Sequence, residues 1–223
     1  MMKKLLLILI LILLLTSCLG TKKYNGFVCR KIKSNSYQQS KKLNDFVQIR
    51  TDSLVMPDTL STCKKLKSLF IPAILYWQWE NTIKCDLNPS TPTSILHSFI
   101  ESYADSVKLK EKLNGQTLEL SILKIPSSFI WTYKGHCIIF LVAYTIGELE
   151  AIYPLGQYLK VNYRLLKGGQ ETKTGTLTIK NIDLPIKNTW KSTRKFTWLY
   201  IDQYDKNIKN LSKLLIDKLL TEI

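Results

Sequence analysis

The sequence predicts an α+β fold: one domain in which two main helices pack on one face of a mostly antiparallel sheet. Residues 73–87 alternate apolar and polar side chains, which is typical of a long strand with one buried face. Residues 92–113 and 198–220 carry apolar side chains at three- and four-residue spacing, as amphipathic helices do. The segments between these helices are strand-like, and strands that follow one another without intervening helices pair antiparallel.

The elements follow in order. A short strand is expected over 46–51, before the long one. The first helix follows a Pro- and Ser-rich turn, with Thr91 as its expected N-cap, and Gly115 ends it. Four further strands are expected over 117–125, 137–146, 157–166 and 174–182. The segment 137–146 is apolar on both faces and is expected to be central, while Gly168-Gly169 predicts a hairpin between the last two.

The N-terminus predicts export. Lys3 and Lys4 precede the apolar run Leu5–Leu15, which is 11 residues long. As a helix this run reaches about 16 Å, whereas a hydrocarbon core is about 30 Å thick. Residues 1–17 are therefore expected to be a cleaved signal peptide and not a transmembrane anchor.

The end of this run, Leu15-Thr16-Ser17-Cys18, resembles the lipobox of bacterial lipoproteins. The resemblance implies cleavage between Ser17 and Cys18 and acyl chains on Cys18, which would make the membrane a partner of the chain. The residues that follow include no aspartate at the second position and no acidic run. By the same resemblance, the expected location is the outer membrane, facing the periplasm.

The mature chain is expected to have two parts. Residues 18–44, rich in Lys, Ser, Asn and Gln, predict a lipidated N-terminus and flexible tether, and residues 45–223 predict the single domain. The chain has a formal net charge of +15. For an exported protein this charge does not indicate nucleic acid but an anionic lipid or glycan, or simply a solvated, lysine-rich surface.

Four cysteines follow Cys18, namely Cys29, Cys63, Cys85 and Cys137. An oxidising compartment allows up to two disulfides among them. The expected elements favour Cys29–Cys63 and Cys85–Cys137, although the two strand cysteines are equally well explained as small buried hydrophobes. With no CxxC pair and only two histidines, neither a metal site nor a cofactor is predicted.

Aromatic and apolar residues are the candidate contact sites. Trp77 and Trp79 share one face of the long strand and are either core residues or part of a ligand or partner surface. Tyr153 and Leu155 lie between Gly147 and Gly156, in a segment expected to be an exposed loop that contacts a partner.

No catalytic motif is present. An enzyme would need a polar cleft that brings His136 together with Glu148 and Glu150. Separately, Asp52-Ser53-Leu54 and Asp58-Thr59-Leu60 resemble the acceptor pattern of bacterial general O-glycosylation, which implies modification at Ser53 and Thr59.

The layout from residue 73 onward resembles the small lipoproteins that assist ABC-type transport across the envelope. The features that carry it are the long strand, the hairpin at Gly168-Gly169 and the closing helix. The resemblance implies a non-catalytic component that binds an envelope protein partner. A lipid- or glycan-binding lipoprotein is the alternative, and an enzyme acting on envelope polymer is a second one.

Overall fold

The computed structural model describes residues 19–35, 46–73, 75–139, 144–156, 158–180 and 183–223, and in this part the strands form two sheets. One sheet has the order β1 (Val47–Arg50), β4 (Thr117–Lys124), β7 (Tyr158–Lys167), β8 (Gln170–Lys180). The other has the order β2 (Ser61–Pro72), β3 (Tyr76–Leu87), β5 (Ser128–Ile139), β6 (Tyr144–Pro154), β9 (Ile186–Asn188). The β1–β4 pair is parallel and the other described pairs are antiparallel, which confirms the α+β class.

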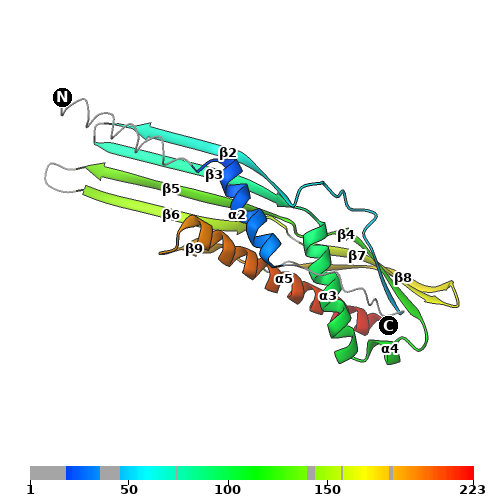
Figure 1. The fold of residues 1–223 in the computed structure, drawn as a ribbon. Coiled ribbons are helices and arrows are strands. Elements are labelled where there is room, and N and C mark those ends of the chain that lie inside the picture. Colours follow the sequence, from blue (N-terminus) through cyan, green and yellow to red (C-terminus); the bar gives the residue numbers. More distant parts are fainter. Residues whose placement is uncertain (1–18, 36–45, 74, 140–143, 157, 181–182) are drawn as a thin grey trace.

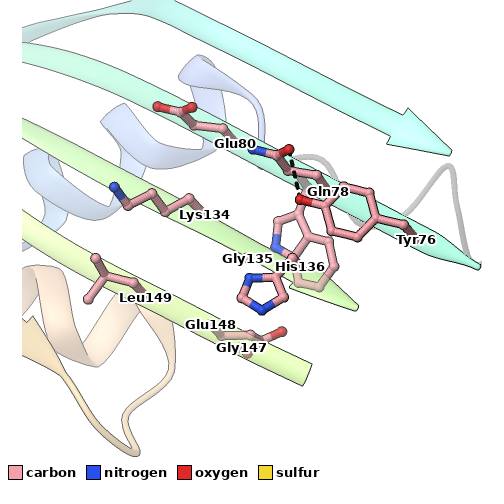
Figure 2. A pocket seen from close by; sticks show the side chains of 10 residues that line it. Tyr76, Gln78, Glu80, Lys134, Gly135, His136, Gly147, Glu148 and Leu149 are labelled. Atoms are coloured by element: carbon pink, nitrogen blue, oxygen red, sulfur yellow. Dashed lines mark hydrogen bonds between the residues drawn. The ribbon is translucent and has the colours of Figure 1, made fainter. Parts of the chain in front are cut away.

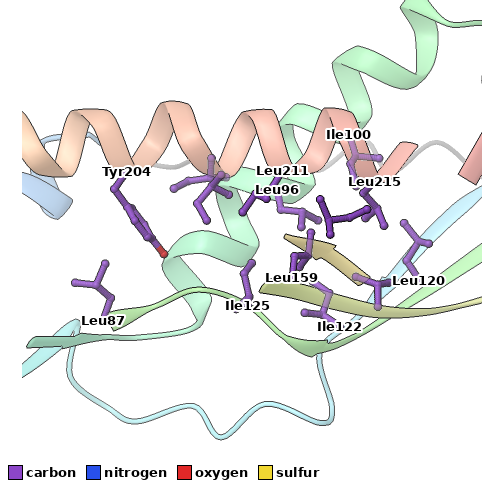
Figure 3. Close-up of a cluster of buried hydrophobic side chains, with 14 of the residues drawn as sticks. Leu87, Leu96, Ile100, Leu120, Ile122, Ile125, Leu159, Tyr204, Leu211 and Leu215 are labelled. Carbon is purple, nitrogen blue, oxygen red and sulfur yellow. The ribbon is translucent and has the colours of Figure 1, made fainter. Parts of the chain in front are cut away.

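The helices lie along one side of the sheets (Figure 1). They are α2 (Thr21–Ser34), α3 (Ser90–Ser106), the short α4 (Leu109–Lys112) and α5 (Thr193–Glu222). The long C-terminal helix confirms the expected amphipathic stripe, since its residues Tyr204, Ile208, Leu211, Leu215 and Leu219 are buried. Figure 3 shows part of this stripe packed above the four-stranded sheet. One contiguous apolar core therefore joins both sheets to the helices.

The expected flexible tether is wrong for residues 21–34, because they form helix α2 and pack into the core. The rings of Tyr24 and Trp131 lie 5.1 Å apart, and the indole of Trp198 donates a hydrogen bond to the Phe27 carbonyl at 3.1 Å. The many lysines of this segment hid an apolar stripe that also includes Val28 and Ile32. Residues 21–34 are therefore part of the folded domain and not of a tether. Residue 18 and residues 36–45 of the same segment lie outside the described residues.

The prediction of one central strand over 137–146 is also wrong. Strand β5 ends at Ile139, strand β6 begins at Tyr144, and these two residues pair across the antiparallel ladder. The expected loop over 147–156 is strand for most of its length, since β6 continues to Pro154. An apolar run gives no signal of a chain reversal within it, because both strands of the hairpin are apolar there.

The first predicted helix begins and ends differently from expectation. Its first residue is Ser90, so Pro89 and not Thr91 occupies the N-cap position, and the Ser90 N–H donates to the Asn88 side-chain oxygen at 2.9 Å. Helix α3 ends at Ser106, because Lys108 adopts a left-handed conformation with φ +52°. The hairpin between β7 and β8 is confirmed, with positive φ at both Gly168 and Gly169.

The expected disulfide pairings are wrong. Cys63 and Cys85 lie directly opposite each other in the β2–β3 ladder, with Cα atoms 4.2 Å apart, and they form the disulfide. Cys29 and Cys137 are free thiols, and the Cys29 sulfur lies 3.1 Å from the Ser61 hydroxyl. The lysines around Cys63 hid strand β2, so the pairing of that cysteine with its neighbour in the sheet was not foreseen.

Candidate functional site

Strands β2, β3, β5 and β6 extend together beyond the end of helix α2 (Figure 1). We call the outer end of these strands the sheet tip, defined by Phe70–Pro72, Leu75–Trp77, Cys137–Ile139 and Ile146. The register places Trp77 beside Cys137 and Cys137 beside Ile146, while Tyr76 pairs with Ile138. The candidate residue Trp77 therefore belongs to an apolar end of a four-stranded segment.

The sheet tip is exposed. Six of its large hydrophobic side chains are exposed, namely Phe70, Ile71, Leu75, Tyr76, Trp77 and Ile146, with exposed fractions from 38% to 58%. Side chains alternate across a strand, so Trp77 lies on the same face as Ile83, while Tyr76 lies on the opposite face. The face that packs on the core near Ile83 is thus uncovered at the tip, where Trp77 lies.

The covered part of that face ends near Asn81. The Asn81 side chain is buried and donates a hydrogen bond to the Leu19 carbonyl at 3.1 Å. Leu19 itself packs against the core. Leu19, the first residue that the structure describes, therefore lies at the border between the helix-covered sheet and the exposed sheet tip.

Trp79, the second candidate, lies between these two regions and is half-buried. A Cβ atom on Gly135 would come within 2.6 Å of the Trp79 ring, so glycine lets this indole lie flat on strand β5. On the opposite face, a Cβ on Gly147 would come within 2.7 Å of the His136 ring. Gly135 and Gly147 thus each leave room for an aromatic ring, that of Trp79 on one face of the sheet and that of His136 on the other.

A shallow depression of about 340 Å³ lies next to the sheet tip (Figure 2). Its lining residues come from β3, β5 and β6 and include Gln78, Glu80, Lys134, His136 and Leu149. The Tyr76 hydroxyl donates to the Gln78 side-chain oxygen Oε1 at 3.0 Å, and Glu80 forms an ion pair with Lys67 at 2.6 Å. The depression is an open surface of mixed polar and apolar character beside an apolar one.

Of the three residues that an enzyme would need, His136 and Glu148 both line this depression, whereas Glu150 does not. His136 lies over Gly147 on the face away from the helices, whereas Glu148 lies on the helix-facing side. There Glu148 accepts a hydrogen bond from the Tyr133 hydroxyl at 2.8 Å, and burial together with this carboxylate raises the pKa of Tyr133 to about 12. The buried Glu150 accepts from the Trp131 indole at 2.8 Å.

Tyr153 and Leu155 lie at the other end of β6. Tyr153 is seven residues from Ile146, or about 23 Å along a strand. Leu155 lines a second depression of about 680 Å³ together with Tyr158, Lys180 and Asp183. Burial raises the pKa of the Asp183 carboxyl. The structure therefore separates the predicted contact residues into two surfaces.

The remaining predicted residues lie elsewhere. Ser53 and Thr59 are both exposed in the irregular segment between β1 and β2, and Ser17 and Cys18 lie outside the described residues.

Phe70 was not predicted as a surface residue, because strand β2 was not predicted from the sequence. A signal was available, since no charged residue occurs in 68–79 or in 135–147. Within the described ranges, no three His, Cys, Asp or Glu residues are arranged to hold a metal ion.

Comparisons with protein-family models, with curated proteins and with solved structures found no match to this chain. Among the helices of the described residues, none combines the length and the apolar character that crossing a membrane requires.

Proposed function

We propose that this chain is a lipoprotein of the bacterial envelope, anchored by acyl chains on Cys18 in the outer membrane and facing the periplasm. Its domain acts as a non-catalytic component of a transport or assembly complex and binds an envelope protein. The observation that carries the proposal is the lipobox Leu15–Cys18 at the end of an apolar run too short to span a bilayer.

The geometry next to Cys18 supports this anchor. Leu19 is held against Asn81, and helix α2 begins at Thr21. A lipid on Cys18 would therefore hold the folded domain directly at the bilayer, without a long spacer. A domain held this closely meets partners that lie at the same membrane.

The separation of the polar residues supports a non-catalytic role. The side chains of His136 and Glu148 lie on opposite faces of the sheet, and the Glu150 carboxylate accepts a hydrogen bond from the Trp131 indole. A general base must lie within hydrogen-bond reach of the proton that it abstracts. We assign partner binding to the surface around Leu155, where the neighbouring Leu184 is 71% exposed and borders Asp183 of the second depression.

Labelling of growing cells with radioactive palmitate tests the anchor. The parent protein is expected to carry the label and to fractionate with outer membranes, and Cys18→Ala is expected to lose both properties. Cys29→Ala is the matched control, because Cys29 is a free thiol in the folded domain and this variant should behave as the parent. An unlabelled parent, or a Cys18→Ala protein that fractionates like the parent, would contradict the proposal.

Partner binding is tested by chemical crosslinking of the lipidated protein in isolated envelopes. The parent is expected to give a discrete crosslinked product with one envelope protein, and Leu155→Glu is expected to lose it. Leu214→Glu is the control, because Leu214 is exposed to a similar degree on helix α5 and is not part of the second depression. Equal crosslinking of both variants would contradict the assigned surface.

A further inference from the structure

We propose that the sheet tip inserts into the surface of the bilayer that holds Cys18, so that the domain is attached at two points, the acyl anchor and the tip. This inference rests on the proposed lipidation of Cys18. The occupant of the exposed apolar surface is thus phospholipid, at the boundary between headgroups and acyl chains.

The first argument is the absence of charge. Residues 68–79 and 135–147 contain no Asp, Glu, Lys or Arg, and the described residues among them lie in the outer parts of strands β2, β3, β5 and β6 or next to them. The whole chain is 22% charged, so 25 residues of average composition would carry about five charges. Charged residues return immediately on the inner side, at Lys67, Glu80, Lys134 and Glu148. The boundary is sharp and lies at one level across the sheet.

The second argument is that the sheet tip is apolar on both faces. Trp77 and Ile146 lie on the helix-facing side, and Ile71 and Tyr76 lie on the other side. All four side chains are exposed. Antiparallel sheets usually bury one face and leave the other in water. Exposed apolar side chains on both faces suit lipid, which surrounds the tip, better than a partner that covers one face.

The third argument is the position of the chain that leads to Cys18. Leu19 is hydrogen-bonded to Asn81, four residues from Trp77 along β3, or about 13 Å at 3.3 Å per residue. A headgroup layer is about 5–8 Å thick on each side of the bilayer. With Leu19 just outside the headgroups, the charged residues near Glu80 lie among the headgroups, and Trp77 reaches the acyl chains.

The residue types agree with this depth. Tryptophan and tyrosine are enriched at membrane interfaces, where their rings contact apolar chains and their polar atoms remain near water. Amphipathic segments of peripheral proteins enter about 5–10 Å into this boundary. Deeper entry is disfavoured, because β2 is the outer strand of its sheet in the described part of the chain and its unpaired backbone groups would have to leave water.

The acyl chains of Cys18 are the alternative occupant of the sheet tip. They would start beside Leu19 and could cover the helix-facing side, where Trp77 lies. They would leave Ile71 and Tyr76 on the opposite face exposed to water. Insertion into the bilayer covers both faces, and we therefore assign the tip to bilayer phospholipid.

The test is fluorescence quenching by phospholipids brominated in the upper part of their acyl chains. The mature, acylated protein is reconstituted into vesicles of phosphatidylethanolamine and phosphatidylglycerol with and without the brominated lipid. Only bilayer phospholipid carries bromine, so chains on Cys18 do not quench. Trp77→Phe is compared with Trp190→Phe, since Trp190 is 95% exposed and lies outside the tip. Circular dichroism and thermal unfolding verify that both variants fold as the parent does.

We expect brominated lipid to quench the parent, and we expect Trp77→Phe to lose at least half of the quenched signal while Trp190→Phe keeps it. Absent quenching, or equal quenching of the two variants, overturns the inference. Mass spectrometry of the N-terminal peptide shows separately whether Cys18 is acylated. If Cys18 carries no acyl chains, the proposed anchor fails. Quenching of the unacylated protein mixed with the same vesicles then still decides whether the tip enters lipid.

Discussion

The Cys63–Cys85 disulfide is expected to stabilise the domain by about 3 kcal/mol. The bond joins residues 22 positions apart, and closing a loop of about that length removes roughly 3 kcal/mol of chain entropy from the unfolded state at 25 °C. For a domain of this size each kcal/mol shifts the melting temperature by about 2–4 °C. The variant Cys63→Ala should therefore melt about 6–12 °C below the parent.

The assay combines thiol counting with urea unfolding. The denatured, unreduced mature protein should expose the two thiols of Cys29 and Cys137, and peptide mapping should recover Cys63 joined to Cys85. Cys29→Ala is the control. It removes a cysteine that forms no disulfide, and we expect the free energy of unfolding to change by less than about 1 kcal/mol.

Two results would refute this reasoning. One is a mapped Cys29–Cys63 or Cys85–Cys137 bond, which would mean that the β2–β3 register differs from the one described. The other is equal stability of Cys63→Ala and Cys29→Ala, which would mean that the disulfide does not restrict the unfolded chain.

Two further changes have defined outcomes. Leu215→Ala should lower the free energy of unfolding by about 2–5 kcal/mol, because this side chain is fully buried. The control Leu214→Ala changes a neighbouring side chain that is 42% exposed, and it should change the free energy of unfolding by less than about 0.5 kcal/mol. Equal urea midpoints of the two variants would contradict the described buried face of α5. The pKa of Tyr133 is raised to about 12 from an ordinary value of 10.0, so its contribution to stability is present below pH 10 and is lost as the pH rises through about 12. Glu148→Gln should lower the pKa of Tyr133, since it removes the charge that opposes ionisation, while burial keeps this pKa above 10. Phenolate absorbance titrations, each corrected with the Tyr133→Phe variant, measure the pKa. An unchanged titration would exclude the contact between Glu148 and Tyr133.

Much of the fold was predictable from local patterns. The long strand β3, the hairpin at Gly168-Gly169 and helix α5 each follow a periodic pattern or a turn signal that depends only on nearby residues. Strand β2 and helix α2 were missed because their lysines dilute the apolar pattern, although α2 buries Tyr24 completely. A few well-placed apolar side chains suffice for packing, and composition does not reveal them.

The candidate site was predictable only in part. Alternation along β3 correctly placed Trp77 and Trp79 on one face, but it implied that this whole face is buried. The face is buried at Ile83 and exposed at Trp77, because helix α2 covers only part of the strand. His136 and Glu148 lie on opposite faces because their strands pair in a register that no local pattern specifies.

The sequence by itself determined the α+β class and the periodic elements, since each depends on residues close together in the chain, and the resemblance of Leu15–Cys18 to a lipobox is the basis of the proposed anchor. Only the tertiary structure decided the partner of Cys63, the chain reversal between Ile139 and Tyr144, and the exposure of the sheet tip. An apolar run predicts that its side chains are shielded from water. What covers them, whether a helix, a neighbouring strand or a surface outside the chain, depends on residues far away in the sequence.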